Sequence, residues 1–404
     1  MKTRAIVLSL ALLGGCDKKK DDGPAASPAT TGAKATEAAA AKPADKAAEP
    51  PAASKVTKDQ ADAFGKKMAE AMAKCDGKGI DALIDTRTFS DRAIAAAGKS
   101  AASALRNTTV GPSLCAGLGD DFTVTYKGVY DKDGSFRPRI RTIVRGGVNF
   151  LEPVLDVGRD GTVKAVDIFS LRNGENMSDL LALVGKFLGH ASGPQAAKDY
   201  VEATKKHGEG NYVAARAAFQ RIPTELRAKI KAVALQGLTI DVQHPPDVYL
   251  ASIDEFRKNF PDDASVDMVE IDAHSLRKEH EKLIASLTRL MNKVDEDAYV
   301  QVLRALAHKD ARDLAAAKTD AEAAFKKEPT LVPAMDLVLD VAIAQKRFAD
   351  GIPALDAMVA RGIDKQTLVK TLAADAHYAP LAKSAEYKAW VKAAAPAPAA
   401  GSAN

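Results

Sequence analysis

Residues 233–261 decide the fold of the second half of this chain; they read VALQGLTIDVQHPPDVYLASIDEFRKNFP. Apolar or small residues recur there at helical spacing in two runs, which predicts two successive helices. These residues are Val233, Gly237 and Ile240, then Tyr249, Ile253 and Phe256. Pro261 closes the pattern, and Pro329 closes a similar one 68 residues later, which is two units of 34. Such a period predicts repeated helix pairs, so we expect residues 195–392 to be helical throughout.

The same period has a known counterpart. A unit of 34 residues with a bulky residue, then a small one, then Tyr, and later Ala, Phe and Pro resembles the tetratricopeptide repeat. A second segment is similar to the turn and second helix of such a repeat, with Gly210, Asn211, Tyr212, Ala215, Phe219 and Pro223. His274 and His308 stand where the family has Tyr, and Pro353 lies inside the last second helix. These departures leave the number of repeats open, and an unrelated α-helical bundle is the alternative.

The resemblance implies a curved stack whose first helices offer side chains to a protein or peptide partner. We expect the partner-facing residues on first helices, outside the core pattern, at Asp241, Glu270, Arg304 and Asp340. A stack also needs a cap, because its last helix pair otherwise exposes an apolar face. Residues 378–391 predict that capping helix, with Tyr387, Trp390 and Val391 turned inward.

Residues 58–190 predict an α+β domain. Residues 61–75 place Phe64, Met68, Ala69, Met72 and Cys75 on one helical face. Alternating runs separated by turn residues predict four strands, at residues 122–126, 139–144, 148–157 and 163–169. Successive hairpin joints imply a four-stranded antiparallel meander with helices on one face. That order is similar to NTF2-like or cystatin-like folds, in architecture only.

The N-terminus carries an export signal. Residues 1–15 combine Lys2 and Arg4 with a nine-residue apolar stretch, which is typical of a signal peptide. The small residues before Cys16 resemble the lipobox of bacterial lipoproteins, in which this cysteine becomes the acylated N-terminus. The resemblance implies a lipid anchor in a cell-envelope membrane, facing the periplasm or the cell surface. An ordinary signal peptide is the alternative. Residues 16–57 and 393–404 predict a disordered linker that begins at the lipidated cysteine and a loose tail, because both lack large apolar residues.

Two cysteines remain for the α+β domain, Cys75 and Cys115. In an oxidising compartment an even pair can form a disulfide, which here would tie the helical layer to the strands. Two free thiols are the equal alternative.

Composition and motifs argue against several function classes. The chain has 57 basic and 53 acidic residues, a balance too even for a nucleic-acid binder. It contains no GxSxG, Walker A or GxGxxG motif, and its histidines lack the spacing of a zinc-binding helix. We therefore expect no catalytic residue, metal or cofactor, and we predict a non-catalytic scaffold that binds a protein or peptide.

Two other functions stay open. The α+β domain can bind a small ligand or hydrolyse one in a pocket between its sheet and helices. Asp156, Asp160 and Asp167 lie on or beside the predicted strands and are the acids that such a pocket would use. The chain can also be a purely structural part of a larger envelope assembly.

Overall fold

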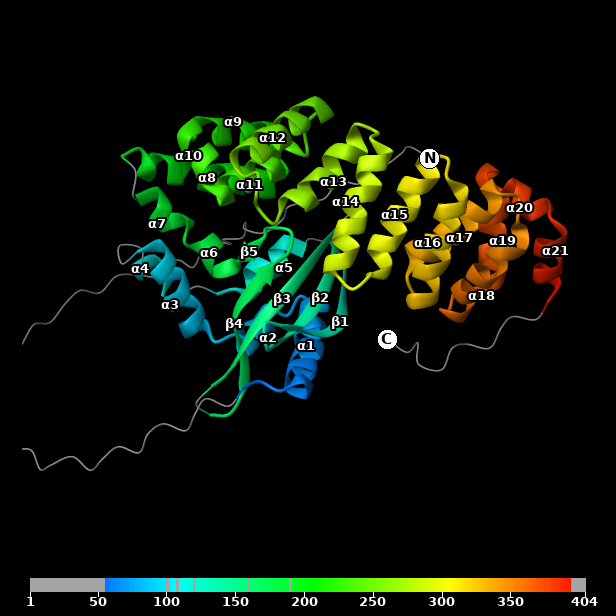
Figure 1. Ribbon diagram of the computed structural model, residues 1–404, viewed down its shortest axis with the longest axis horizontal. Helices are drawn as coiled ribbons and strands as arrows, with labels where there is room; N and C mark the ends of the chain where they lie inside the picture. Colours follow the sequence, from blue (N-terminus) through cyan, green and yellow to red (C-terminus); the bar gives the residue numbers. More distant parts are fainter. Residues whose placement is uncertain are drawn as a thin grey trace, which may run out of the picture.

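A computed structural model describes residues 55–98, 102–106, 109–118, 121–144, 146–158, 160–188 and 191–393. The signal sequence, Cys16, nearly all of the linker and the tail beyond residue 393 lie outside the described residues. The chain forms a small antiparallel sheet with helices on one face, followed by a long helical region (Figure 1). The α+β class of the first region and the helical class of the second are therefore confirmed.

Short polar caps start the N-terminal helices. Thr57 and Gln60 form a capping box on α1 (Lys58–Ala73), in which each side chain accepts from the other residue's backbone N–H. Asp76 and Asp85 cap the next two helices in the same way. The helices that follow α1 are α2 (Gly77–Leu83), α3 (Thr86–Ala97), α4 (Ala102–Leu105) and α5 (Gly111–Leu118). The prediction for Cys75 was wrong, because α1 ends at Ala73 and Cys75 is exposed in the turn beyond it, with φ 50°.

The sheet has five strands in the order β1-β2-β3-β4-β5, all antiparallel. They are β1 (Phe122–Lys132), β2 (Ser135–Val144), β3 (Gly147–Val157), β4 (Val163–Ser170) and β5 (Glu175–Asn176). The first four match the alternating runs, although β1 and β2 are longer than expected. The four-stranded prediction missed β5, because two residues are too few to show alternation. Helix α6 (Met177–Leu181) and helix α7 (Leu183–Leu188) then lead out of the sheet.

Both faces of the sheet are covered. Ile140, Leu151 and Ile168 pack with α1, α2 and α5 in one core. Val148 and Phe150 alternate with them on β3 and belong instead to the core of the helical region. Because successive residues of a strand point to opposite faces, the sheet lies between two helical layers. The two regions therefore share a core rather than standing apart on a linker.

The helical region is a stack of helix pairs. No strand occurs among its described residues, 191–393. Its α-helices are α8 (Gly193–Gly208), α9 (Tyr212–Arg221), α10 (Thr224–Lys229), α11 (Lys231–Asp241), α12 (Pro246–Asn259), α13 (Val266–Leu276), α14 (His280–Lys293), α15 (Ala298–Asp310), α16 (Leu314–Lys327), α17 (Val332–Ala344), α18 (Ile352–Ala360), α19 (Lys365–Ala374), α20 (Ala379–Lys383) and α21 (Ala385–Lys392). Helices α12, α14 and α16 end at positions 34 residues apart.

The turn inside each pair repeats at the same interval. Gly210, Lys278, Arg312 and Lys346 all have positive φ, between 57° and 72°. At each of them the next N–H bonds the carbonyl five residues back, which is the Schellman helix end. Position 244 is the remaining place in the 34-residue series, and there the next residue is Pro245, which has no N–H to donate. The period is therefore built into the backbone hydrogen bonds.

The end of the stack differs from the predicted single helix. Ser384 interrupts residues 378–391 and caps α21, because its Oγ accepts from the Tyr387 N–H at 3.1 Å. Tyr387 and Trp390 are buried as predicted. The prediction for Val391 was wrong, because 38% of this residue is exposed. It lies one residue, or about 100°, beyond Trp390 around the helix, which turns it out of the core.

Candidate functional site

The four predicted partner-facing residues lie on four different first helices, and the structure does not bring them together. Asp241 ends α11, where its carboxylate accepts from Arg216 Nε at 2.9 Å and from Ser252 Oγ at 2.5 Å. Glu270 on α13 pairs with Arg257 at 2.9 Å and with Arg289 at 3.3 Å. Both acids thus bind cations of neighbouring helices.

The other two make the same kind of contact. Arg304 on α15 binds both carboxylate oxygens of Asp320 at 2.7 Å, a bidentate pair between α15 and α16. Asp340 on α17 pairs with Lys309 Nζ and with His377 Nε2, each at 2.8 Å. All four predicted residues therefore tie one helix of the stack to another in this structure.

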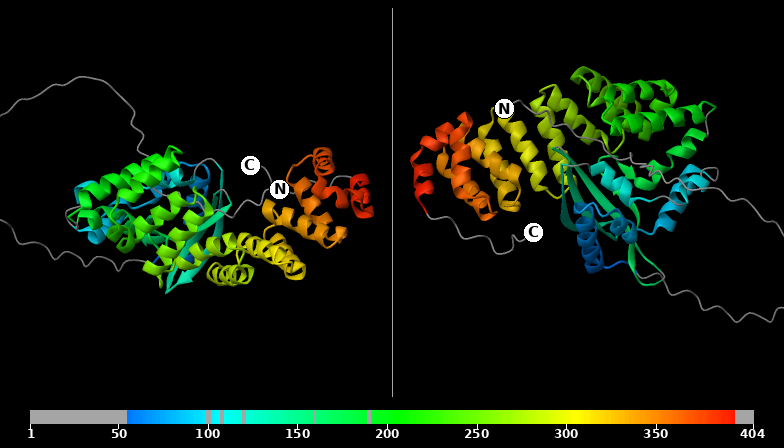
Figure 2. Two further views of the ribbon diagram at one scale, coloured as in Figure 1. Left: turned by 90° about the horizontal axis from the view of Figure 1, so that it is seen from above. Right: turned by 180° about the vertical axis from the view of Figure 1, so that it is seen from behind.

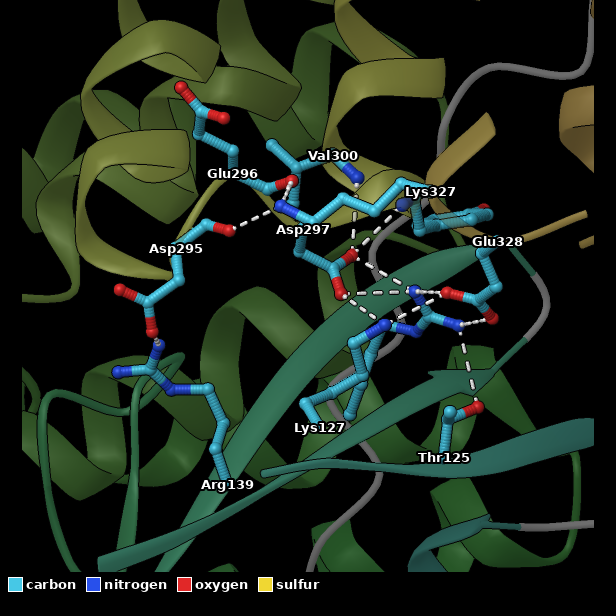
Figure 3. Close-up of polar contacts among 11 residues, drawn as sticks. Thr125, Lys127, Arg139, Asp295, Glu296, Asp297, Val300, Lys327 and Glu328 are labelled. Carbon is cyan, nitrogen blue, oxygen red and sulfur yellow. Dashed lines mark hydrogen bonds and ion pairs between the residues drawn. The ribbon is translucent and has the colours of Figure 1, made fainter. Parts of the chain in front are cut away.

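A buried ion cluster joins the sheet to the stack. We call Arg141, Lys127, Asp297 and Glu328 the Arg141 cluster. Arg141 of β2 is 1% exposed, and its Nη1 lies 3.0 Å from both carboxylate oxygens of Asp297. Its Nη2 donates to Glu328 at 2.7 Å. Lys127 of β1 completes the cluster, 2.8 Å from Glu328 and 3.2 Å from Asp297 (Figure 3).

The charges of this cluster balance, two cations against two anions, so burial does not leave a lone charge. Burial alone would lower the pKa of Arg141, but its hydrogen bond to Glu328 and the charge of Asp297 outweigh burial and raise it. Burial would likewise raise the pKa of Glu328, yet its bonds to Arg141 and Lys127 hold it below the ordinary value. Each side chain thus stays charged because its partners are in place.

The position of Asp297 follows from its sequence. It caps α15, since its carboxylate accepts from the backbone N–H of Tyr299 at 2.9 Å and of Val300 at 3.4 Å. Lys327 at the end of α16 donates to the carbonyls of Asp295 and Glu296, at 2.7 and 2.9 Å (Figure 3). The loop before α15 is therefore held from two sides before it meets the sheet.

Two more arginines of the sheet region reach the stack. Arg139 bonds Glu152 at 3.0 Å beside it on the sheet and Asp295 at 2.8 Å. Arg172 follows β4 and is buried near Asp272 of α13, whose Oδ2 accepts from Tyr249 Oη at 2.7 Å. Burial lowers the pKa of Arg172, while the charge of Asp272 opposes this shift. The sheet is thus attached to the stack at more than one point.

The sequence analysis missed this joint. The signals were present: Arg137, Arg139 and Arg141 alternate along one strand, and residues 295–297 read DED just before a helix. Alternating arginines put one row of positive charge on one face of a strand, and acids at a helix N-terminus form a negative site that suits it. Nothing in one sequence says that the two meet, because 156 residues separate Arg141 from Asp297.

A surface groove lies between the early helices of the stack. We call it the α9–α12 groove; its volume is about 350 Å³. Arg216 and Phe219 of α9, Arg227 of α10, Gly237 and Asp241 of α11 and one side of α12 line it. In Figure 1 and in the right-hand view of Figure 2, α9 and α12 lie on the side of the stack away from the sheet. Of the predicted residues, only Asp241 contributes to this groove.

A second cavity, of about 310 Å³, lies at the end of the sheet. Asp85, Asp156, Asp160 and Lys164 line it. Asp167 does not join them, because it is buried and accepts from Ser178 Oγ at 2.5 Å. Among the residues that the structure describes, no group of three acids, histidines or cysteines could hold a metal ion. The three acids considered for a hydrolytic pocket therefore do not converge.

The two remaining cysteines are neighbours. Cys115 and Cys75 are free thiols that share a hydrogen bond. Burial, together with this hydrogen bond, raises the pKa of Cys115 to about 12. Cys75 is exposed and Cys115 is partly exposed. Both outcomes considered from the sequence, a disulfide and two thiols, stay open for the protein in its own compartment.

Comparison with protein-family models, with curated proteins and with solved structures finds no match to this chain. In the part of the chain that the structure describes, no helix is long and apolar enough to cross a membrane. The function is therefore argued from the geometry above.

Proposed function

We propose that this protein is a lipid-anchored, non-catalytic scaffold of the bacterial cell envelope that binds a protein or peptide through tetratricopeptide-like helix pairs. The observation that carries the proposal is the Schellman turn that recurs at positions 210, 278, 312 and 346. Stacked units of one size produce a long, continuous surface, and such surfaces suit extended partners. Cys16, outside the described residues, would hold this surface near a membrane through its acyl chains.

The sheet limits which part of that surface is open. Arg141 and Arg172 enter the stack at α13 and α15, so the sheet itself covers the stack there. Figures 1 and 2 show α17 to α21 beyond the edge of the sheet. The α9–α12 groove opens on the other side. We therefore place the partner on the side of the stack away from the sheet rather than on the sheet-facing helices.

The lining of the groove favours binding over catalysis. Ser252 Oγ donates to Asp241, but the other oxygen of Asp241 accepts from Arg216. A carboxylate neutralised in this way is a poor general base, because its proton affinity is lowered by the cation. The serine is thus held by a hydrogen bond and not activated as a nucleophile.

The test is photocrosslinking in intact cells from a probe amino acid placed at Ala251, in the groove. A probe at Asp133, in the exposed β1–β2 turn, is the matched control. We expect one repeated crosslinked product from Ala251 and none from Asp133. Equal products from both positions, or no product from Ala251, would reject a partner in this groove.

The lipid anchor has its own test. Replacement of Cys16 by Ser should move the protein from the membrane fraction to the soluble fraction without changing its circular dichroism spectrum. Replacement of Cys75 by Ser is the control, and it should leave the protein with the membrane. Continued membrane association of the Cys16→Ser protein would refute lipid anchoring.

A further inference from the structure

The wall that α12 gives to the α9–α12 groove carries two acids with no counter-ion. Its lining residues include Asp247, Ala251, Glu255 and Asn259, four residues apart, so they form one ridge along the helix. Asp247 and Glu255 are both exposed. Within the described residues neither forms an ion pair.

The cations of the groove are already engaged. Arg216 is paired with Asp241 at 2.9 Å. Arg227 donates from Nε to the Ile222 carbonyl and from Nη2 to Thr224 Oγ1, both at 3.0 Å, and its guanidinium lies over the Phe219 ring. The formal charge of the lining is thus negative, with two arginines against three acids, and the negative side is the α12 wall.

The floor is apolar and closely packed. Gly237 of α11 allows the Phe219 ring to lie against the helix, since a Cβ at position 237 would be 2.6 Å from its Cζ. Phe256 and Val248 lie beside it in the lining. Gln220 and Asn259 add amide groups, which can both donate to and accept from a peptide backbone. Apolar floor, amide rim and charged wall together suit a polypeptide strand.

We propose that the α9–α12 groove binds an extended basic segment of another protein, with two cationic side chains four residues apart. This deepens the proposed scaffold function and depends on it. Asp247 and Glu255 are eight residues apart on α12, about 12 Å at 1.5 Å per residue. In an extended segment, residues i and i+4 lie about 13 Å apart and point to the same side. A Lys-x-x-x-Lys segment therefore matches the two acids in spacing and in charge.

The test uses blocked, fluorescent peptides and the full protein, with anisotropy as the measurement. The probe has the sequence AKPAAKPA; AKKPAAPA has the same composition with adjacent lysines, and AEPAAEPA has the opposite charge. We expect AKPAAKPA to bind more tightly than both, with an affinity that falls as salt is added. The double variant Asp247→Asn/Glu255→Gln should weaken its binding about tenfold, as expected for the loss of two exposed charge pairs.

The matched control is Asp262→Asn/Glu281→Gln. Both of its residues are exposed and outside the groove, and Glu281 lies in the first turn of α14, as Asp247 does in α12. This variant should bind AKPAAKPA as the unaltered protein does. Ala251→Lys, which puts a cation in the middle of the ridge, should abolish binding. Equal weakening by the control, or equal binding of AEPAAEPA, would overturn the proposal.

Other occupants give different results. The chain's own residues 42–46 read KPADK, with the same spacing. If replacing Lys42 and Lys46 by Ser tightens peptide binding, its own N-terminal segment occupies the groove and the proposal is wrong. Self-association that Asp247→Asn/Glu255→Gln abolishes would assign the groove to a second copy and also reject it. A crosslink from Ala251 without peptide preference would reject the basic segment alone, whereas no crosslink would reject the scaffold function.

Discussion

The guanidinium of Arg141 lies 3.0 Å from each carboxylate oxygen of Asp297, so strand β2 and helix α15 meet through one buried ion pair. Both side chains are about 1% exposed. Buried ion pairs add little net stability, but removal of one partner leaves a charge that neither water nor protein compensates. The pair therefore fixes how the sheet sits on the stack.

Arg141→Met should destabilise the protein by about 3–5 kcal/mol, because Asp297 loses its main buried partner. Urea unfolding followed by circular dichroism measures the change. Lys74→Met is the control, since Lys74 forms only an exposed pair with Glu70 on the same helix. The control should change stability by less than about 0.5 kcal/mol. A loss below 1 kcal/mol for Arg141→Met, by the same estimate, would mean that Lys127 alone can hold the two acids.

The same cluster predicts how stability depends on pH. The pKa of Glu328 lies below its ordinary value of 4.5 in the folded chain, despite burial, because of Arg141 and Lys127. The pKa of Glu279 falls to about 2, through its bonds to Lys282 and His274. Between those values the unfolded chain binds more protons than the folded one, so stability is lost as pH falls. We expect the urea midpoint to drop steadily from about pH 4.5 to about pH 2.

Glu328→Gln should make that dependence less steep, because glutamine has no carboxylate to protonate. The midpoint at neutral pH will be lower in this variant, but its slope between the two pH values is the quantity to compare. Glu281→Gln, at an exposed position, should keep the original slope. Parallel curves for Glu328→Gln and the unaltered protein would show that Glu328 does not contribute.

The sequence predicted the elements of the fold better than it predicted their assembly. Residues 139–144 and 148–157 alternate clearly, because one face of each strand is apolar, so β2 and β3 were expected. The sheet's second face was not expected to meet the stack, although Val148 and Phe150 lie in the stack's core. Periodicity shows that a residue is buried, but not which distant segment buries it.

The candidate site shows the same limit. Asp241 was expected on a first helix and lies in the α9–α12 groove. Asp247 and Glu255 were missed, because an exposed acid on a helix normally faces only solvent, and their sequence contains nothing unusual. Only the packing of α9 against α11, with Gly237 under Phe219, makes the space that gives these acids a role.

The adjacent thiols predict a redox effect. In an oxidising compartment we expect Cys75 and Cys115 to form a disulfide, with attack from exposed Cys75, because the pKa of about 12 makes the Cys115 thiolate scarce. Mass spectrometry after unfolding and alkylation without reductant should then find neither thiol modified. Reduction should lower stability by about 4 kcal/mol, as the chain-entropy model gives for a loop of about 40 residues. Alkylation of both cysteines would establish the alternative of two free thiols.

The recurring turn predicts a stability gain at a fixed interval. Arg312 has φ 67°, a conformation that costs a residue with a Cβ about 1 kcal/mol. Arg312→Gly removes this strain and keeps the backbone bond from Asp313 to the His308 carbonyl. We expect it to stabilise the protein by about 0.5 kcal/mol, after the greater flexibility of glycine in the unfolded chain is subtracted. Thermal unfolding measures the change, and Lys278→Gly should behave in the same way.

His244→Gly is the matched control, because position 244 is in the same place in the 34-residue series but lacks the positive φ. Glycine relieves no strain there, and it removes the contact of His244 Nε2 with the Tyr212 carbonyl at 3.2 Å. Stability should therefore fall, by about 0.5–1 kcal/mol from backbone flexibility alone. Opposite signs at positions 312 and 244 would tie the 34-residue period to the Schellman turn, since Pro245 blocks that turn at one place only. Changes of the same sign at both positions would contradict this account of the period.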